Sequence, residues 1–222
     1  MFVALLGLAV AAPPAAASQP RPDRAQALHA SLRAGNAGYG LLGGFRHRTA
    51  RGISLGVDAE SVYIIEAFIG GFAVPSNLRV AGRVPFQFPV LHSERLTLAL
   101  TVAPGFRWTR SLAADAPERT SVAVTADVGA FAYLHRDRFS WTAGIDNPIS
   151  VQVRPITDVD TLGTLLVTGP IVPITERLHW YATVEAGGVF GSDGDAGKFL
   201  LRGTTGIRGF FGPTGSSWRA YY

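Results

Sequence analysis

The chain has 222 residues, a length that suits one β domain or one barrel. It contains no cysteine, which excludes disulfides, cysteine-ligated zinc and thiol catalysis. The net charge is +4 and the isoelectric point about 9.8, but the arginines are dispersed along the chain and Lys198 is the only lysine. Nucleic-acid binding needs a concentrated basic patch, so this dispersion argues against a nucleic-acid partner.

The first 35 residues differ in composition from the rest. An apolar run from Phe2 to Ala12 leads into small residues that end at Ala17, which predicts a secretory signal peptide over residues 1–17. No lysine or arginine precedes the run, which departs from the usual leader. Residues 18–35 are predicted to form a linker or a short helix, because Asp23–Ala34 is alanine-rich and Gly35 suits a helix C-cap. A ragged start to the first strand is the alternative.

Residues 36–222 carry a two-residue rhythm and are predicted to form one domain. From Leu78 to Val90, apolar side chains occupy one parity, and Arg79, Arg83 and Gln87 occupy the other. Side chains alternate faces along a strand, so this pattern predicts a strand with one apolar and one polar face. The same pattern recurs over residues 95–102, 121–134, 139–154, 178–186 and 198–211.

The connections between these segments favour a membrane barrel. Tight turns at residues 92–93, 135–137 and 174–175 alternate with longer polar segments at 109–119, 155–160 and 191–197. Outer-membrane barrels have short periplasmic turns and longer outer loops. The mean hydropathy is +0.21, yet no apolar run after the leader reaches the roughly 20 residues of a membrane helix. The predicted fold is therefore all-β, an antiparallel up-and-down transmembrane β-barrel.

The strand count depends on the early part of the barrel. If Ile53–Ile69 is one long strand, the barrel closes with eight strands, which is the preferred prediction. If this segment breaks near Ala59–Glu60 and Asn36–Phe45 also pairs, the count is ten. Membrane strands need only about 9–11 residues, so both counts are compatible with the sequence.

The apolar face is predicted to point outward. Glycines on the polar face suit a crowded barrel interior, and aromatic residues on the apolar face lie near strand ends, as in interfacial girdles. The alternative is a secreted soluble barrel of the lipocalin type, with the apolar face around an apolar ligand. The predicted girdle residues are Phe88, Phe106, Trp108, Phe139, Trp141 and Trp180.

Alternating strands, tight turns and longer loops over Gly52–Tyr222 resemble the small outer-membrane barrels of the OmpA and OmpX type. The resemblance lies in pattern and implies an outer-membrane location in a Gram-negative bacterium. It also implies two partners, outer-membrane lipid and the barrel-assembly machinery. In that family the machinery reads an aromatic residue at the end of the last strand, and here Tyr222 is terminal. Pro213 interrupts the approach to it, so an end of the final strand at Phe211 is the alternative.

Charged residues on the polar face are the candidate functional residues. They are predicted to line the lumen, either as an arginine-rich pore or anion site or as a structural network that fills the interior, because buried charges must be paired. The predicted set is Glu66, Arg79, Arg83, Asp127, Asp146, Arg154, His179, Glu185, Arg202 and Arg208.

No catalytic, metal or cofactor motif is predicted. His92-Ser93-Glu94 are adjacent in a tight turn, whereas a triad needs converging groups. Gly191–Asp195 lacks the ligand spacing of a calcium loop. The expected function is structural, adhesive or narrowly pore-forming, with a surface partner at loops 109–119, 155–160 and 191–197. A lipid-modifying enzyme is the alternative, and it would need a Ser/His/acid cluster on the barrel wall.

Overall fold

The computed structural model describes residues 25–49, 52–69, 72–112, 120–136, 138–154, 161–175, 177–191 and 197–211, with the backbone alone at residues 25, 65–69 and 72–75. The predicted signal peptide and the end of the chain lie outside these residues. No helix in the described part of the chain is long and apolar enough to cross a membrane. The strands are β1 (Ala25–Gly35), β2 (Gly38–Arg48), β3 (Ser54–Ile69), β4 (Phe72–Arg83), β5 (Phe86–His92), β6 (Leu96–Ser111), β7 (Thr120–His135), β8 (Ser140–Arg154), β9 (Thr161–Pro173), β10 (Leu178–Gly191) and β11 (Lys198–Phe211).

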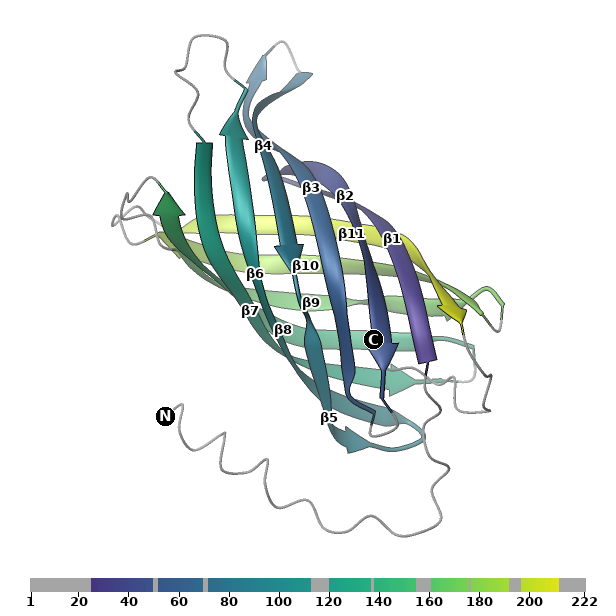
Figure 1. Ribbon diagram of the computed structural model, residues 1–222. Helices are drawn as coiled ribbons and strands as arrows, with labels where there is room; N and C mark the ends of the chain where they lie inside the picture. The colour runs from purple at the N-terminus through teal and green to yellow at the C-terminus, as the bar shows by residue number, and fades with distance from the viewer. Residues whose placement is uncertain are drawn as a thin grey trace.

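The strands form one closed antiparallel barrel (Figure 1). Neighbours in the sequence pair with one another around the wall, and β1 pairs with both β2 and β11. The pairing of β2 with β3 joins the remaining strands to this side, so the sheet has no free edge. This is the up-and-down topology that the alternation and the turns predicted.

Strands β4 and β5 are two halves of one wall strand. Arg83 faces Asp58 of β3 and Gln87 faces Ser54, so both halves keep one register. The interruption lies at Val84–Pro85. The Gly56 N–H donates to the Pro85 carbonyl at 3.0 Å and the Val84 N–H donates to the Pro104 carbonyl at 2.8 Å, but neither proline has an N–H to return. The wall therefore has ten strands.

The preferred count of eight strands is wrong, and the alternative count of ten is correct. Most of Asn36–Phe45 pairs within β2, as that alternative required, but the expected break in Ile53–Ile69 does not occur. β3 runs unbroken through Ala59–Glu60. The two additional strands are β1 and β2, which together precede it. The first of them was not expected to be a strand, because its alanine content is typical of a helix.

Residues 25–35 form strand β1 and not a helix. Leu28 and Leu32 point outward and are more than half exposed, whereas His29 and Ser31 are buried on the inner face. This alternation suits a wall strand, and pairing with β2 and β11 satisfies its backbone. A two-residue hairpin at Asn36-Ala37 leads into β2, where Gly38 adopts a φ of 140° that glycine tolerates.

The two ends of the barrel differ. The start of β1 and the end of β11 lie at one end, here called the turn end, together with the short connections at 49–53, 93–95, 136–139 and 174–177 (Figure 1). The other end, here called the loop end, carries the three longest connections, at 112–119, 155–160 and 192–197, together with the two-residue connections at 36–37 and 70–71. Most of the three predicted surface loops, residues 113–119, 155–160 and 192–196, lies outside the described residues.

The apolar parity faces outward around the whole wall. In β6, Leu98, Leu100 and Val102 are exposed, while Ala99 and Ala103, on the opposite parity, are buried. The inner face carries polar and small residues, and its main apolar cluster is Ala99, Tyr133 and Ile171. A soluble carrier would need the reverse arrangement, so the lipocalin-like alternative does not describe this barrel.

Candidate functional site in the lumen

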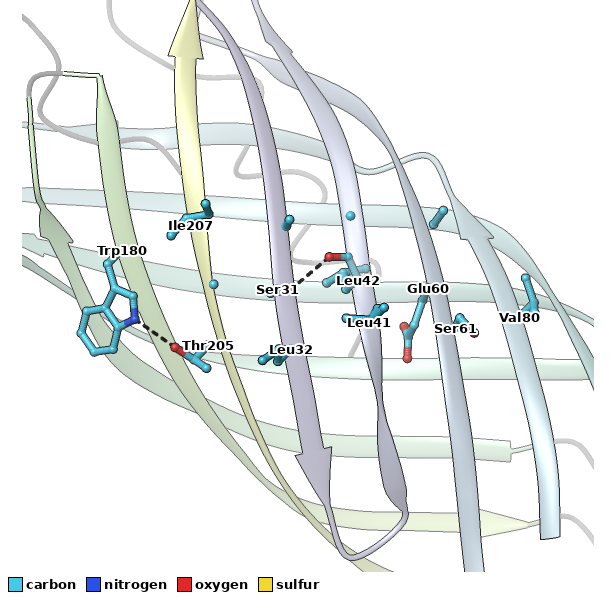
Figure 2. Close-up of a pocket in the computed structure, with 14 residues that line it drawn as sticks. Ser31, Leu32, Leu41, Leu42, Glu60, Ser61, Val80, Trp180, Thr205 and Ile207 are labelled. Atoms are coloured by element: carbon cyan, nitrogen blue, oxygen red, sulfur yellow. Dashed lines mark hydrogen bonds between the residues drawn. The ribbon is translucent and has the colours of Figure 1, made fainter. Parts of the chain in front are cut away.

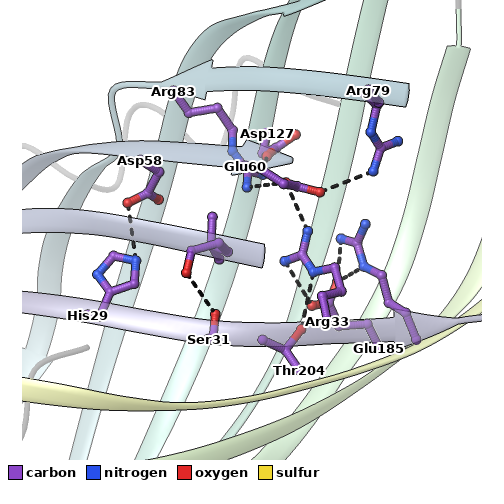
Figure 3. Close-up of polar contacts among 12 residues, drawn as sticks. His29, Ser31, Arg33, Asp58, Glu60, Arg79, Arg83, Asp127, Glu185 and Thr204 are labelled. Carbon is purple, nitrogen blue, oxygen red and sulfur yellow. Dashed lines mark hydrogen bonds and ion pairs between the residues drawn. The ribbon is translucent and has the colours of Figure 1, made fainter. Parts of the chain in front are cut away.

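A connected set of ion pairs crosses the lumen (Figure 3), and its centre is Glu60 on β3. The Glu60 side chain is 5% exposed. Its carboxylate lies 3.0 Å from the Arg33 guanidinium, 3.1 Å from that of Arg79 and 2.8 Å from that of Arg83. Three cations from β1 and β4 therefore converge on one buried carboxylate.

The set extends in both directions from Glu60. Arg83 also donates to Asp127 on β7 at 2.6 Å. Arg33 also reaches Glu185 on β10 at 3.7 Å, and Glu185 accepts from Arg202 on β11 at 2.5 Å. The Arg83–Asp127 and Arg33–Glu185 contacts each pass over an intervening strand, so they connect separate parts of the wall. We call this set the lumenal charge network: Arg33, Glu60, Arg79, Arg83, Asp127, Glu185 and Arg202.

A second cluster lies nearer the turn end. The Asp58 carboxylate accepts two bonds from Arg46, at 2.5 and 2.7 Å, and lies 3.4 Å from Nε2 of His29. Gly44 stands beside this pair on β2, and a Cβ there would lie 2.2 Å from an Asp58 oxygen. The missing side chain makes room for the His29–Asp58 contact.

Five predicted lumen residues belong to the network: Arg79, Arg83, Asp127, Glu185 and Arg202. Arg208 and His179 also lie inside, nearer the turn end, where Arg208 stacks 5.3 Å above the Tyr181 ring and His179 packs edge-on against Phe210. Asp146 faces the lumen from β8, where it lies opposite Gly129 of β7.

Two predicted lumen residues are placed differently. Arg154 is exposed at the end of β8, because a register shift opposite Val122 and Ala123 interrupts the alternation just before it. Glu66 lies in β3, but its side chain falls outside the described ones. Five further inward residues were not among the predicted set, although their parity in the sequence indicates the inner face: His29, Arg33, Arg46, Asp58 and Glu60.

The predicted girdle residues lie on the outer wall. Phe88, Phe139, Trp141 and Trp180 are exposed toward the turn end, while Phe106 and the half-buried Trp108 lie nearer the loop end. The indole N–H groups of Trp141 and Trp180 donate to Thr168 and Thr205 at 2.8 and 3.0 Å. Further exposed aromatic residues of the wall are Tyr39, Tyr63, Phe190, Phe199 and Phe211.

A hydrogen-bonded chain of side chains lies inside the turn end. The Thr97 hydroxyl is 2.9 Å from His92 Nδ1 and 2.9 Å from His135 Nε2, and His135 Nδ1 is 3.0 Å from the Ser140 hydroxyl. Thr97 is fully buried and His135 is 4% exposed. The chain contains a serine–histidine contact, but a threonine stands where a triad has its acid. It does not form the Ser/His/acid cluster of a wall enzyme.

The other motifs considered for chemistry do not assemble. Ser93 bonds to the backbone of Leu96 in the turn, whereas His92 turns toward Thr97. Within the described residues, no group of three or more histidine and acidic side chains could hold a metal ion. Most of Gly191–Asp195 lies outside the described residues.

A closed antiparallel wall, apolar outside and charged inside, is the architecture of a small transmembrane β-barrel of the outer-membrane type. No protein-family model and no curated protein matches the chain.

Solved structures of low identity resemble the fold. The N-terminal β-barrel domain of Pseudomonas aeruginosa OprF has 9% identity and a TM-score of 0.43, over 84% of this chain and 97% of that one. Neisserial surface protein A has 10% identity and a TM-score of 0.40, over 85% and 96%. The Escherichia coli outer-membrane protease OmpT has 7% identity and a TM-score of 0.40, over 86% and 97%.

Proposed function

We propose that this protein is an exported, non-catalytic outer-membrane barrel that acts as a narrow pore with a preference for anions. The lumenal charge network is its constriction. The observation that carries the proposal is the excess of arginine over carboxylate inside the barrel. The described inward groups are Arg33, Arg46, Arg79, Arg83, Arg107, Arg202 and Arg208 against Asp58, Glu60, Asp127, Asp146 and Glu185.

A lumen of this sign favours anions for an electrostatic reason. Fixed charges on the walls of a narrow, low-dielectric passage raise the local concentration of the opposite ion. A ten-stranded wall also encloses a wider interior than an eight-stranded one, whose side chains just fill it. The ion pairs restrict the remaining space, so we expect a small conductance.

The first experiment establishes the location and the fold. Outer-membrane recovery of the expressed protein, with a gel mobility that changes on boiling, is the expected result. A soluble periplasmic protein without a heat-dependent shift would contradict the proposal at its base.

The second experiment measures the pore. Purified protein in planar bilayers should give small conductance steps. Under a salt gradient, the reversal potential should have the sign expected of an anion-selective pore. Arg83→Gln should weaken that preference, while Arg95→Gln, at an exposed turn position, should leave it nearly unchanged. A folded barrel that carries no current would favour the second candidate.

The second candidate is a closed scaffold that presents its loops to a surface partner. The observation that favours it is the continuity of the network, which pairs each of its carboxylates with at least one arginine. Complete pairing is what a plugged interior needs, because an unpaired buried charge is strongly unfavourable. In that case Glu60→Gln would loosen the plug and create conductance that the natural protein lacks.

A further inference from the structure

A groove crosses the outer wall of the barrel over β11, β1, β2 and β3 (Figure 2). Its volume is about 710 Å³. Its floor consists of three outward-facing small residues, Ala30, Gly43 and Ala59, which pair directly with one another across adjacent strands. A row of small residues therefore runs across the strands, in the hydrogen-bonding direction, and no large side chain covers the wall there.

Large side chains border this row. Leu32, Leu41 and Val80 stand two residues toward the loop end, and Leu28 and Val57 stand two residues toward the turn end. Along the row, the floor meets Ile207 of β11 and then Trp180 of β10.

The opposite end of the row is also closed. The Ala59 position continues to Gly82 of β4, where a Cβ would lie 2.7 Å from the Phe106 ring. The ring therefore occupies the space above Gly82. The groove is long, narrow and bounded at both ends by aromatic residues.

We propose that this groove binds one acyl chain of a phospholipid. The inference rests on the barrel lying in a membrane, and it is independent of whether the lumen conducts. The groove opens through a wall whose large exposed residues are apolar, so the medium that faces it in a bilayer is hydrocarbon. Its one acidic neighbour, Glu60, directs its carboxylate into the lumen toward three arginines.

The shape of the groove selects this occupant. The bordering rows lie four residues apart along a strand, about 13 Å between Cα positions before their side chains are added. A protein helix, about 10–12 Å across with its side chains, is too wide for what remains. A single hydrocarbon chain fits over the row of small residues and makes the dispersion contacts that larger side chains would otherwise make there.

The position of Trp180 indicates which leaflet supplies the lipid. Trp180 is the third residue of β10 and stands at the turn-end side of the barrel, where its indole N–H is already bonded to Thr205. All three of the longest connections lie at the opposite end, and longer loops are typical of the outer side, so the turn end is assigned to the periplasmic side. A phospholipid of the periplasmic leaflet can therefore insert one acyl chain into the groove beside the tryptophan.

The test uses the full chain refolded in phosphatidylcholine vesicles that contain a phosphatidylcholine with a photoactivatable group in its acyl chain. Labelled positions are mapped by peptide mass spectrometry, and the boiled and unboiled gel mobility of each sample reports whether the barrel has formed. We expect labelling at the residues bordering the groove to be severalfold higher than at other exposed apolar residues of the wall.

Filling the groove should remove this enrichment. A Cβ at Gly43 meets only ordinary contact distance, 3.5 Å to the His29 carbonyl, so Gly43→Leu should fold. Ala59→Leu is the second filling variant, and Ala130→Leu, an exposed outward alanine on β7, is its matched control. The two filling variants should lower groove labelling to the level of the wall, and the control should not.

Three results would overturn the proposal. Uniform labelling of the wall in the folded natural protein would show that the groove holds no particular chain. If the groove is labelled less than the rest of the wall and a dimer can be chemically cross-linked, the groove would be assigned to a second copy of this chain. Absence of a heat-dependent mobility shift would refute the membrane barrel itself, and bilayer conductance tests the pore separately.

Discussion

At the scale of single residues, Glu60 determines the electrostatics of the lumen. Its buried carboxylate contacts three arginines of β1 and β4. The only other carboxylates of the network that these arginines contact are Asp127 and Glu185. A buried carboxylate is stabilised by this surplus of positive charge, and the arginines in turn depend on it.

Replacement of Glu60 by glutamine should be strongly destabilising. Three guanidinium groups would lose their shared anion but remain in the barrel interior. Removal of one partner from a buried ion pair destabilises a protein by about 3–5 kcal/mol, because the other charge stays buried without compensation. Unfolding by urea in lipid vesicles measures the change in the free energy of unfolding. The control is Glu94→Gln in an exposed turn, for which we expect about 0.5 kcal/mol or less. Similar losses for both variants would contradict the central role of Glu60.

Gly43 and Gly44 are adjacent glycines that test the two faces of β2. A Cβ at Gly44 would lie 2.2 Å from an Asp58 oxygen and 2.7 Å from the His29 ring, whereas a Cβ at Gly43 meets nothing closer than 3.5 Å. We expect Gly44→Ala to destabilise the barrel by about 1–3 kcal/mol through overpacking. Gly43→Ala should be neutral or slightly stabilising, because alanine restricts the unfolded chain. Equal midpoints of thermal unfolding would show that the inner face is not tightly packed there.

At the scale of elements, the interruption between β4 and β5 has a chemical cause. Both halves keep one register against β3 and β6, so packing does not separate them. The separation coincides with Pro85 facing Gly56 and with Pro104 facing Val84, where two donors of the ladder are missing.

Pro85→Val should restore one of these donors. The new amide faces the Gly56 carbonyl, so the two strands should become continuous and this amide should exchange slowly with solvent deuterium. The gain in stability is expected to be about 1 kcal/mol or less, since a typical hydrogen bond contributes about 0.5–1.5 kcal/mol and proline restricts the unfolded chain. An amide at position 85 that exchanges as fast as those in the turns would contradict this explanation.

The elements also show where local sequence was sufficient. Alternation over Leu78–Val90 and Leu178–Ala186 predicted wall strands, because large apolar and charged residues mark the two faces clearly. In residues 25–35 the outward positions include Ala30 and Ala34, whose small size hides the rhythm and suggests a helix. Pairing with β2 and β11 overrides that local preference.

At the scale of the whole molecule, the outward apolar wall predicts a depth-dependent cost for charge. Val102 is exposed near the middle of β6, and Leu112 is exposed just beyond its end. In a bilayer, Val102→Arg should cost about 2–4 kcal/mol and Leu112→Arg about 0–1 kcal/mol. Unfolding titrations in vesicles compare the two. Equal and small costs would indicate that this wall does not face hydrocarbon.

The sequence by itself determined the fold class, the outward direction of the apolar parity and several inward charges, such as Arg83 and Glu185. The strands and the inward charges follow from side-chain alternation, which is local to each strand. The direction of the apolar face follows from the glycines on the polar face and the aromatic residues near strand ends. Only the tertiary structure decided the strand count, since closure depends on whether β2 pairs with β3. It also decided which charges meet, because Glu60 and Arg33 are brought together by register across β2, and it alone aligned Ala30, Gly43 and Ala59 into a groove. Register between strands arises from the closed sheet as a whole, and no single segment encodes it.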